Sequence, residues 1–314
     1  HWPFKQHTTS RNQKLMPYHN HLLERGACFG QAAAYERPMW YAINGNKAEY
    51  KYSYGYQNWY ESAEYETINA RKNVALFELT PFAKFEILGD NAHNSLQILC
   101  ANNIKNIPGS ITYTQMLNSK GGIVSDLTIT CIQKNKFRIV TGSSSRTHDK
   151  KHILKYLDPS VNLKDITDDF ACFGIFGPRS REILTEVFGD YFSKDEFKFG
   201  TCKSIKINNI VLWFQRISYV GELGWEIYIP LENSKHIYEA IINKEKKFNL
   251  VHAGTHAMDI MRMEKGYLHW GHDISPAENP FEAGLDFAIR FNKKENFIGK
   301  EYLIKNKISK KRNL

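Results

Sequence analysis

The order of strand-like and helix-like segments restricts the fold of this chain more than any other feature of its sequence. Alternating apolar and polar residues predict a half-buried strand at 82–89, and an apolar stripe behind an Asx-type cap predicts a helix at 91–103. Three strand-like runs, separated by "NSKGG" and "QKNK", predict a meander over 111–142, and a helix is predicted at 145–157. These segments form one unit of strand, helix, strands and helix.

A comparable unit follows in the second half of the chain. Its predicted elements are a strand at 171–177, a helix at 178–189 with proline in its first turn, strands within 204–230, and helices at 231–244 and 254–266. A further helix is predicted at 62–76, although no strict internal repeat is present. Two such units, roughly 61–165 and 166–290, indicate an α+β fold with largely antiparallel sheets.

The first 58 residues differ from the rest because they are polar and rich in aromatic residues, as in "YERPMWYA" and "YKYSYGYQNWY". Tyr and Trp at this density need a surface that covers them. We therefore expect residues 1–58 to pack on a neighbouring domain. The start at His1 rather than Met, and the Lys-rich end, suggest a piece of a longer polypeptide.

Composition excludes several classes of protein. No apolar run is long enough to cross a bilayer, and the start of the chain has no secretory cleavage pattern. The 5 cysteines are scattered without a C-x-x-C pair, which argues against a disulfide framework or zinc site and favours a reducing compartment. The chain also lacks G-x-G-x-x-G, P-loop and G-x-S-x-G motifs, so it predicts no dinucleotide cradle and no covalent hydrolase.

The net charge of +9 is compatible with nucleic-acid binding, but the lysines are spread along the chain rather than clustered in a motif. A solvated basic surface explains most of this charge. Attraction for an anionic ligand, such as one with a polyglutamate tail, is the alternative. We expect neither a nucleic-acid partner nor a membrane.

Asp126 is an acid with no basic residue beside it in the segment "GGIVSDLTIT". Gly121 and Gly122 permit positive φ and let the backbone approach another group closely. Asp126 is then either a solvated hairpin residue or a carboxylate aimed at a ligand. It shares a strand face with Val124 and can be partly buried, in which case it needs a hydrogen-bond donor.

The segment "SYVGELGWEIYIP" carries a second pair of acids. Glu222 is expected to be solvated in the turn, whereas Glu226 lies in the strand that follows. An unpaired carboxylate there would cost several kcal/mol, roughly, so Glu226 needs a ligand or an arginine partner. Tyr219, on the strand that enters the turn, is expected to face Glu226.

Arg262 lies beside the apolar stripe of the helix at 254–266, where Asp259 or Glu264 could pair with it. Taken alone, it is expected to be a surface arginine. His269 and His272 are followed by an acid and could bind metal, but the intervening glycines argue against one continuous helix face and so against a metal site.

Seven segments of the chain, in order, carry a family pattern. They are "RGACFGQAAAYERPMWYA", "GYQNWYESAEYETINARKNVALFELTPFAKFEILG", "NSKGGIVSDLTIT", "GIFGPRSREIL", "ISYVGELGWEIYIP", "RMEKGYLHWGHD" and "NPFEAGLDFAIRFNKKENFIGKEYL". Together they resemble the C-terminal half of dimethylglycine and sarcosine dehydrogenases, which is similar to the glycine-cleavage aminomethyltransferase. The resemblance covers essentially the whole chain.

The resemblance implies the folate-binding aminomethyltransferase fold over 59–305, with two ferredoxin-like units around a central cleft. It implies that residues 1–58 are a connector that packs on an FAD-dependent oxidoreductase domain outside this chain. It also implies that 306–314 begin a small C-terminal barrel that is otherwise missing. The implied cofactors are tetrahydrofolate here and FAD in the other domain, in a bacterial cytoplasm or a mitochondrial matrix.

The resemblance also implies roles for individual residues. Asp126 matches the family's acid near N5 and N10 of the folate and is the candidate catalytic residue, because a carboxylate can orient N10 or accept its proton. Glu226 can accept both N–H groups of the pterin edge as a charge-assisted fork. The folate-binding candidates are Tyr113, Tyr219, Glu226, Arg262 and Trp270.

The implied reaction captures an iminium or formaldehyde unit from an N-methyl amine as 5,10-methylenetetrahydrofolate. Ser125 and Gly142 stand where stand-alone aminomethyltransferases carry Asp and Asn, which favours the dehydrogenase-type group. A glycine-cleavage-type aminomethyltransferase or related folate-dependent demethylase is the alternative enzyme. A non-catalytic folate-binding scaffold is the other alternative, although Tyr267 replaces the reactive cysteine typical of that group.

Overall fold

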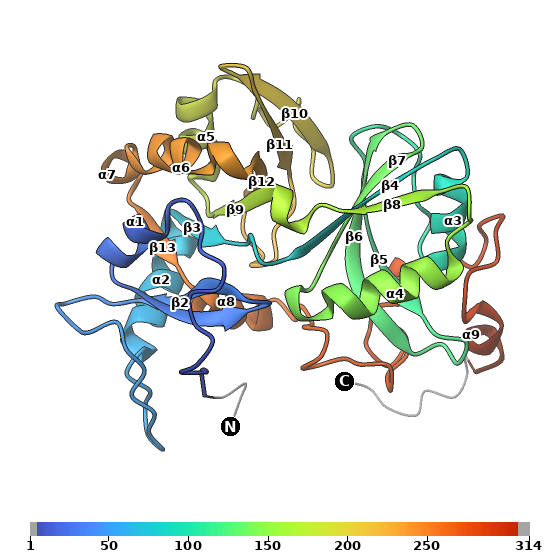
Figure 1. Cartoon of the computed structure of the whole chain (residues 1–314), viewed down its shortest axis with the longest axis horizontal. Coiled ribbons are helices and arrows are strands. Elements are labelled where there is room, and N and C mark those ends of the chain that lie inside the picture. The colour runs from blue at the N-terminus through green and yellow to red at the C-terminus, as the bar shows by residue number, and fades with distance from the viewer. Residues whose placement is uncertain (1–4, 307–314) are drawn as a thin grey trace. The chain divides into compact units, whose positions relative to one another are not determined.

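The computed structural model describes residues 5–306 and divides the chain into two compact units, each with its own sheet and core (Figure 1). Unit 1 comprises His1–Pro81 and Asp168–Tyr267, and unit 2 comprises Phe82–Thr167 and Leu268–Leu314. This division differs from the contiguous halves expected from the sequence. The predicted start of a further domain at 306–314 lies outside the described residues, except for Asn306.

Unit 2 is built on a five-stranded antiparallel sheet with the strand order β5-β6-β7-β4-β8. Its elements are β4 (Ala83–Leu88), α3 (Ala92–Leu99), β5 (Ile111–Leu117), β6 (Ile123–Gln133), β7 (Lys136–Thr141), η1 (Ser143–Ser145), α4 (Arg146–Tyr156), β8 (Asn162–Asp165), η4 (Asp286–Ala288) and α9 (Lys300–Asn306). Without the edge strand β5, the order is that of a ferredoxin-like unit. Apolar side chains of α3, α4 and one face of the sheet form its main core: Leu96, Leu99, Ile153, Phe85, Ile129 and Phe137.

Unit 1 is built on a six-stranded sheet with the order β10-β11-β12-β9-β3-β13. Its strands are β3 (Val74–Glu78), β9 (Phe170–Phe176), β10 (Cys202–Ile207), β11 (Ile210–Gln215), β12 (Gly224–Pro230) and β13 (Leu250–Ala253). Its helices are α1 (His19–Glu24), α2 (Tyr60–Lys72), α5 (Ser180–Phe188), η3 (Leu231–Asn233), α6 (Ser234–Ile242), α7 (Glu245–Phe248) and α8 (Thr255–Glu264), and η2 (Thr167–Asp169) spans the border between the units.

Strand β3 explains why the units are not contiguous in sequence. It pairs with β9 on one side and in parallel with β13 on the other, so a segment from the first quarter of the chain completes the sheet of unit 1. The predicted helix at 62–76 was therefore too long, because the helix ends at Lys72 and Asn73 leaves helical geometry at φ −131 and ψ −106. All five residues of β3 are buried, so both faces of the sheet are covered at this strand.

Part of the aromatic N-terminal segment is covered by unit 1 itself. The hairpin of β1 (Ala27–Ala32) and β2 (Tyr35–Tyr41) belongs to this unit, and Tyr18 and Tyr35 join its hydrophobic core. Trp40 is also fully buried. In contrast, Tyr54 and Tyr56 are exposed, and a covering domain stays a prediction for them.

No helix among the described residues is long and apolar enough to span a membrane. All 5 cysteines lie within the described residues, where they are buried and form no disulfide.

Candidate functional site

The turn before Asp126 needs its two glycines for packing within unit 2. Gly121 has a φ of +75, and a Cβ at Gly122 would lie 2.0 Å from the backbone oxygen of Pro276. The side-chain oxygen of Asn118 accepts the backbone N–H groups of Lys120 and Gly122 at 2.8 and 3.0 Å. The group that these glycines approach closely is thus protein backbone, at Pro276. This contact positions the start of β6.

Asp126 is partly exposed on β6 and is not a freely solvated turn residue. The strand register places Gln115 of β5 directly opposite, and Nε2 of Gln115 donates a hydrogen bond of 2.9 Å to Oδ1 of Asp126. Burial raises the pKa of Asp126 to about 6, while hydrogen bonds from Gln115 and Tyr113 lower it. Asp126 therefore has the donor that a half-buried carboxylate needs, and its pKa is close to that of an effective general base.

Tyr113 lies two residues before Gln115 on β5 and so shares a face of the sheet with it and with Asp126. Its ring stacks on Phe287, with centroids 6.0 Å apart and planes inclined by 22°. The structure therefore brings the predicted pair Tyr113 and Asp126 together. Gln115 was missed in the sequence, although its parity with Tyr113 is a signal that could have found it.

A second acid that the sequence did not single out, Asp149, is fully buried in unit 2. Its Oδ2 accepts hydrogen bonds from the hydroxyls of Ser125 at 2.8 Å, Thr141 at 2.5 Å and Ser145 at 2.8 Å. Its Oδ1 lies 2.9 Å from Nδ1 of His148. This cluster joins α4 to β6 and β7, and it accounts for serine at 125, since an acid there would face another carboxylate.

Replacing Asp149 with alanine is expected to lower the free energy of unfolding by about 3 kcal/mol, because three buried hydroxyls lose a charged acceptor. Ser125→Asp is expected to act in the same direction through like-charge repulsion. Urea denaturation measures both, with the exposed Asp90→Ala of the same unit as the control. If Asp149→Ala has the same free energy of unfolding as Asp90→Ala, the cluster does not have the structural role described.

Trp270 is held within unit 2 by its own contacts. Its indole Nε1 donates to the backbone oxygen of Ile123 at 2.9 Å, and its ring stacks on His148 with centroids 5.6 Å apart. These contacts fix the ring beside the start of β6. A folate contact for Trp270 stays a prediction.

Glu226 lies in the middle of β12 in unit 1 and is partly exposed. The hydroxyl of Tyr228, two residues along the same strand, donates to Oε2 of Glu226 at 2.6 Å. The residue opposite Glu226 on β11 is Gln215, which is fully buried. β11 ends at this residue, so Tyr219 lies in the following loop, and the expectation that it lies on the strand was wrong. That Tyr219 faces Glu226 stays a prediction.

Arg262 is 5% exposed, so the expectation of a surface arginine was wrong. Its guanidinium donates to Oδ1 of Asp259 at 2.7 Å and to the backbone oxygen of Tyr267 at 2.9 Å. The ring of Tyr267 stacks on Tyr219, with centroids 6.3 Å apart. Tyr267 thus links two of the predicted residues, Tyr219 and Arg262, within unit 1.

Arg71 contacts two acidic side chains whose partners the sequence did not determine. It pairs with Glu222 at 2.6 Å, and it also contacts Glu264. Glu222 is therefore ion-paired rather than solvated in the turn, and Glu264 contacts Arg71, while Arg262 pairs with Asp259.

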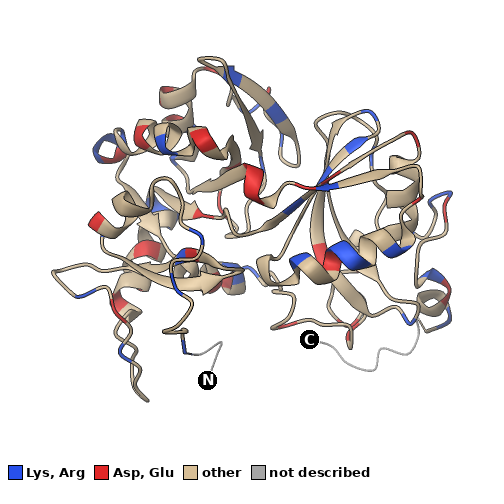
Figure 2. Cartoon of the chain, in the orientation of Figure 1, with Lys and Arg blue, Asp and Glu red and all other residues tan. Residues whose placement is uncertain are grey.

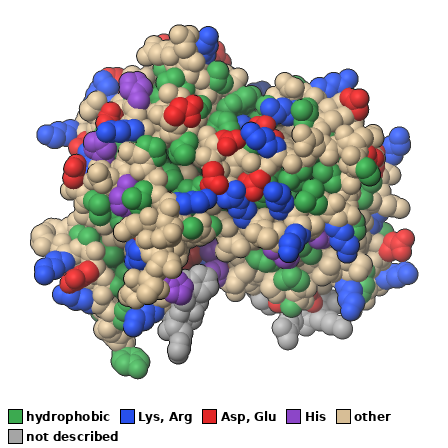
Figure 3. Space-filling model, in the orientation of Figure 1, with side chains coloured by type: hydrophobic (Ala, Val, Ile, Leu, Met, Phe, Trp, Pro, Cys, Tyr) green, Lys and Arg blue, Asp and Glu red, His purple; other side chains and the backbone are tan. Residues whose placement is uncertain are grey.

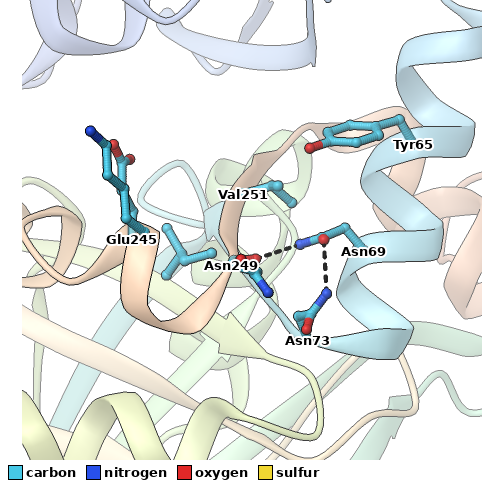
Figure 4. A pocket seen from close by; sticks show the side chains of 8 residues that line it. Tyr65, Asn69, Asn73, Glu245, Asn249 and Val251 are labelled. Carbon is cyan, nitrogen blue, oxygen red and sulfur yellow. Dashed lines mark hydrogen bonds between the residues drawn. The ribbon is translucent and has the colours of Figure 1, made fainter.

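A polar pocket of about 470 Å³ lies elsewhere in unit 1 and contains none of the predicted site residues (Figure 4). Three asparagines contribute to its wall, together with Tyr65, Glu245, Lys246, Leu250 and Val251. Asn69 donates to the backbone oxygen of Asn249 at 2.8 Å, and Asn73 donates to Oδ1 of Asn69 at 3.1 Å. The pocket holds no arrangement of acid, base and nucleophile, and we assign it no role.

Basic and acidic residues are both spread over the elements of each unit (Figure 2). The visible face of the space-filling view carries side chains of both charges (Figure 3). The rings of His269 and His272 have centroids 4.3 Å apart. Over residues 5–306, no group of three or more His, Cys, Asp or Glu side chains could hold a metal ion.

A model of the family described as "GCVT N-terminal domain" matches residues 18–293. The chain belongs to this family. Two curated relatives of this GCVT-domain chain have 36% sequence identity to it. They are 4-methylaminobutanoate oxidase (formaldehyde-forming) of Paenarthrobacter nicotinovorans, aligned over 97% of this chain and 37% of the relative, and mitochondrial dimethylglycine dehydrogenase of Homo sapiens, aligned over 90% and 33%. The chain spans about a third of the length of these relatives.

Among solved structures, the GCVT-domain chain is similar to glycine cleavage system aminomethyltransferase T from Bartonella henselae. The TM-score is 0.78 at 20% identity, over 94% of this chain and 75% of that one. This likeness shows the fold, which is the aminomethyltransferase fold that the sequence predicted.

Proposed function

We propose that this chain is the tetrahydrofolate-binding, one-carbon transfer module of an N-methyl amine dehydrogenase. Its product would be 5,10-methylenetetrahydrofolate. The observation that carries the proposal is Asp126, a partly exposed carboxylate that Gln115 and Tyr113 hydrogen-bond on one face of the sheet. Family membership supports folate as the ligand. The names of the relatives, an oxidase that forms formaldehyde and a dimethylglycine dehydrogenase, support the substrate class.

The donor and acceptor groups of the chain fit this ligand. Bound tetrahydrofolate would supply N5 and N10 as the nucleophiles that accept the one-carbon unit. The ionised carboxylate of Asp126 orients N10 or takes its proton as positive charge develops there. Gln115 occupies only one of the roughly four lone-pair positions of that carboxylate, so a ligand N–H can share it.

Glu226 is proposed to bind the pterin edge by accepting hydrogen bonds from N3–H and the 2-amino group. The Tyr228 hydroxyl holds Oε2 of Glu226 in place and supports this role. Tyr219 is proposed to pack on the pterin, and Tyr113 and Trp270 to line the folate. Arg262 is proposed to face the p-aminobenzoyl-glutamate side.

An FAD-dependent oxidoreductase domain, continuous with this chain or associated with it, is proposed as the source of the one-carbon unit. The exposed rings of Tyr54 and Tyr56 offer this domain a contact surface. We propose that the protein acts in a bacterial cytoplasm or in the mitochondrial matrix, and the name of the human relative, which calls that protein mitochondrial, supports the second location.

The pH dependence of product formation tests the proposal. Asp126 must be ionised to act as a base, so the rate is expected to fall as the pH drops through about 6. The raised pKa has the opposite effect on stability, because a protonated Asp126 favours the folded state. Loss of activity at low pH is therefore expected without loss of fold, and circular dichroism at each pH checks this.

The measurement is the formation of 5,10-methylenetetrahydrofolate from formaldehyde, corrected for the uncatalysed rate, together with a tetrahydrofolate binding titration. A chain that binds tetrahydrofolate without accelerating the product would support the scaffold alternative. Transfer of the one-carbon unit to tetrahydrofolate from an aminomethyl-lipoyl protein, rather than from an N-methyl amine, would support the glycine-cleavage alternative. No binding of tetrahydrofolate would refute the proposal.

A further inference from the structure

Gln115 is the side chain that most directly controls Asp126. The two residues are directly opposite in the antiparallel pair of β5 and β6, and Nε2 of Gln115 donates to Oδ1 of Asp126 at 2.9 Å. Gln115 is 0% exposed, whereas Asp126 is partly exposed. The buried amide therefore holds Oδ1 of the carboxylate, and besides the hydrogen bonds from Gln115 and Tyr113 the partly exposed carboxylate keeps lone pairs for a ligand.

The other polar atom of Gln115, Oε1, is buried and has no hydrogen-bond partner in the part of the chain that the structure describes. An unpartnered buried acceptor is costly, and an apolar side chain of the same shape would remove this cost. A glutamine selected only for packing would thus be a poor choice here. A rotation of the amide that exchanges Nε2 and Oε1 would change only the hydrogen bond to Asp126, because the side chain of Gln115 makes no other hydrogen bond in the described chain.

A primary amide suits a carboxyl group that changes its protonation state. Its NH₂ group donates to an ionised carboxylate, and its oxygen accepts from a protonated one after the amide rotates by half a turn. Besides burial, the groups that shift the pKa of Asp126 are Gln115 and Tyr113, both on β5. On the other side of β6, β7 places the uncharged Val140 opposite Thr128, the next residue on the same face as Asp126.

We propose that Gln115 is the positioning residue of Asp126, which it holds through Nε2 while the carboxylate is ionised and through Oε1 when Asp126 is protonated. This inference rests on the proposed function of Asp126 as a base. Gln115 itself does not touch the ligand. It keeps the carboxylate oriented through a full cycle of proton uptake and release.

The test follows the titration of Asp126 directly, without folate. The chain is labelled with ¹³C at aspartate Cγ, and the signal of Asp126 is assigned by its loss in Asp126→Asn. Gln115→Met keeps the length of the side chain but removes both the donor to the ionised carboxylate and the acceptor for the protonated one. Because the bond to the charged form is the stronger of the two, the apparent pKa of Asp126 is expected to rise by about one unit. Thr130→Val is the control, because it removes a different fully buried polar group, a hydroxyl without a partner in the described chain, from β6, the strand that carries Asp126.

A second measurement needs no substitution. In wild-type chain labelled with ¹⁵N, the side-chain amide signals of Gln115 are expected to titrate with the same midpoint as Asp126, because the amide rotates with the proton. The proposal is overturned if Gln115→Met shifts the titration no more than Thr130→Val does, or if the Gln115 signals do not respond to pH. Coupled titration in a chain that fails to bind tetrahydrofolate would support this inference and refute the proposed function instead.

Discussion

Replacing Glu226 with alanine is expected to abolish measurable tetrahydrofolate binding. Each hydrogen bond to a charged group contributes about 1.5–3 kcal/mol, and the proposed fork makes two of them. The loss of about 3 kcal/mol or more corresponds to a Kd at least about 100-fold weaker. Isothermal titration with tetrahydrofolate measures this effect, and the unfolding midpoint checks that the variant is folded.

The matched control for Glu226 is Glu222→Ala, four residues earlier in the chain. Glu222 is engaged by Arg71 and is not proposed to contact the ligand, so its removal is expected to leave the affinity within about threefold. Glu226→Gln is expected to resemble Glu226→Ala, because its NH₂ group presents donors to the donors of the pterin edge. An unchanged affinity in Glu226→Ala would remove the pterin assignment.

The substitution Asp126→Asn is expected to separate binding from chemistry. Asparagine keeps the size of the side chain, so tetrahydrofolate should bind within about threefold of wild type. It cannot accept the proton, and the rate of 5,10-methylenetetrahydrofolate formation should fall by about 10²–10⁴-fold. Stopped-flow measurement of product formation, with binding measured separately, gives both quantities.

Asp158→Asn is the control for this second experiment, since Asp158 accepts hydrogen bonds from Ser160 in a turn and is not part of the proposed site. It is expected to retain the wild-type rate. An Asp126→Asn variant with the wild-type rate and affinity would show that Asp126 is not the base. Loss of binding together with rate would instead assign Asp126 to ligand recognition.

Sequence reasoning predicted most elements of unit 2 because their periodicity is local. The strand β4, the helix α3 and the meander of β5, β6 and β7 lie where the alternation of apolar residues placed them. It failed at β3, where "NVAL" continues a helical segment in composition but forms a strand between β9 and β13. No local pattern reveals partners that lie about 100 and 175 residues further along the chain.

The sequence predicted the positions of the site residues better than it predicted their hydrogen-bond partners and burial. Asp126 and Glu226 were identified as acids within strands, which is where they lie. Their immediate partners, Gln115 and Tyr228, were not foreseen, although both have the parity that brings side chains onto one face of a sheet. Arg262 was misjudged because burial depends on what packs over the helix.

By itself, the sequence determined the family, the α+β class and the strands that carry the two acids, because motif order and hydrophobic period are properties of the linear chain. Only the tertiary structure decided which segments complete each sheet, which residues bury Asp149, and which side chain holds Asp126. The physical reason is that strand pairing and burial depend on contacts between distant segments, and these contacts set the register, the pKa of Asp126 and the orientation of the Gln115 amide.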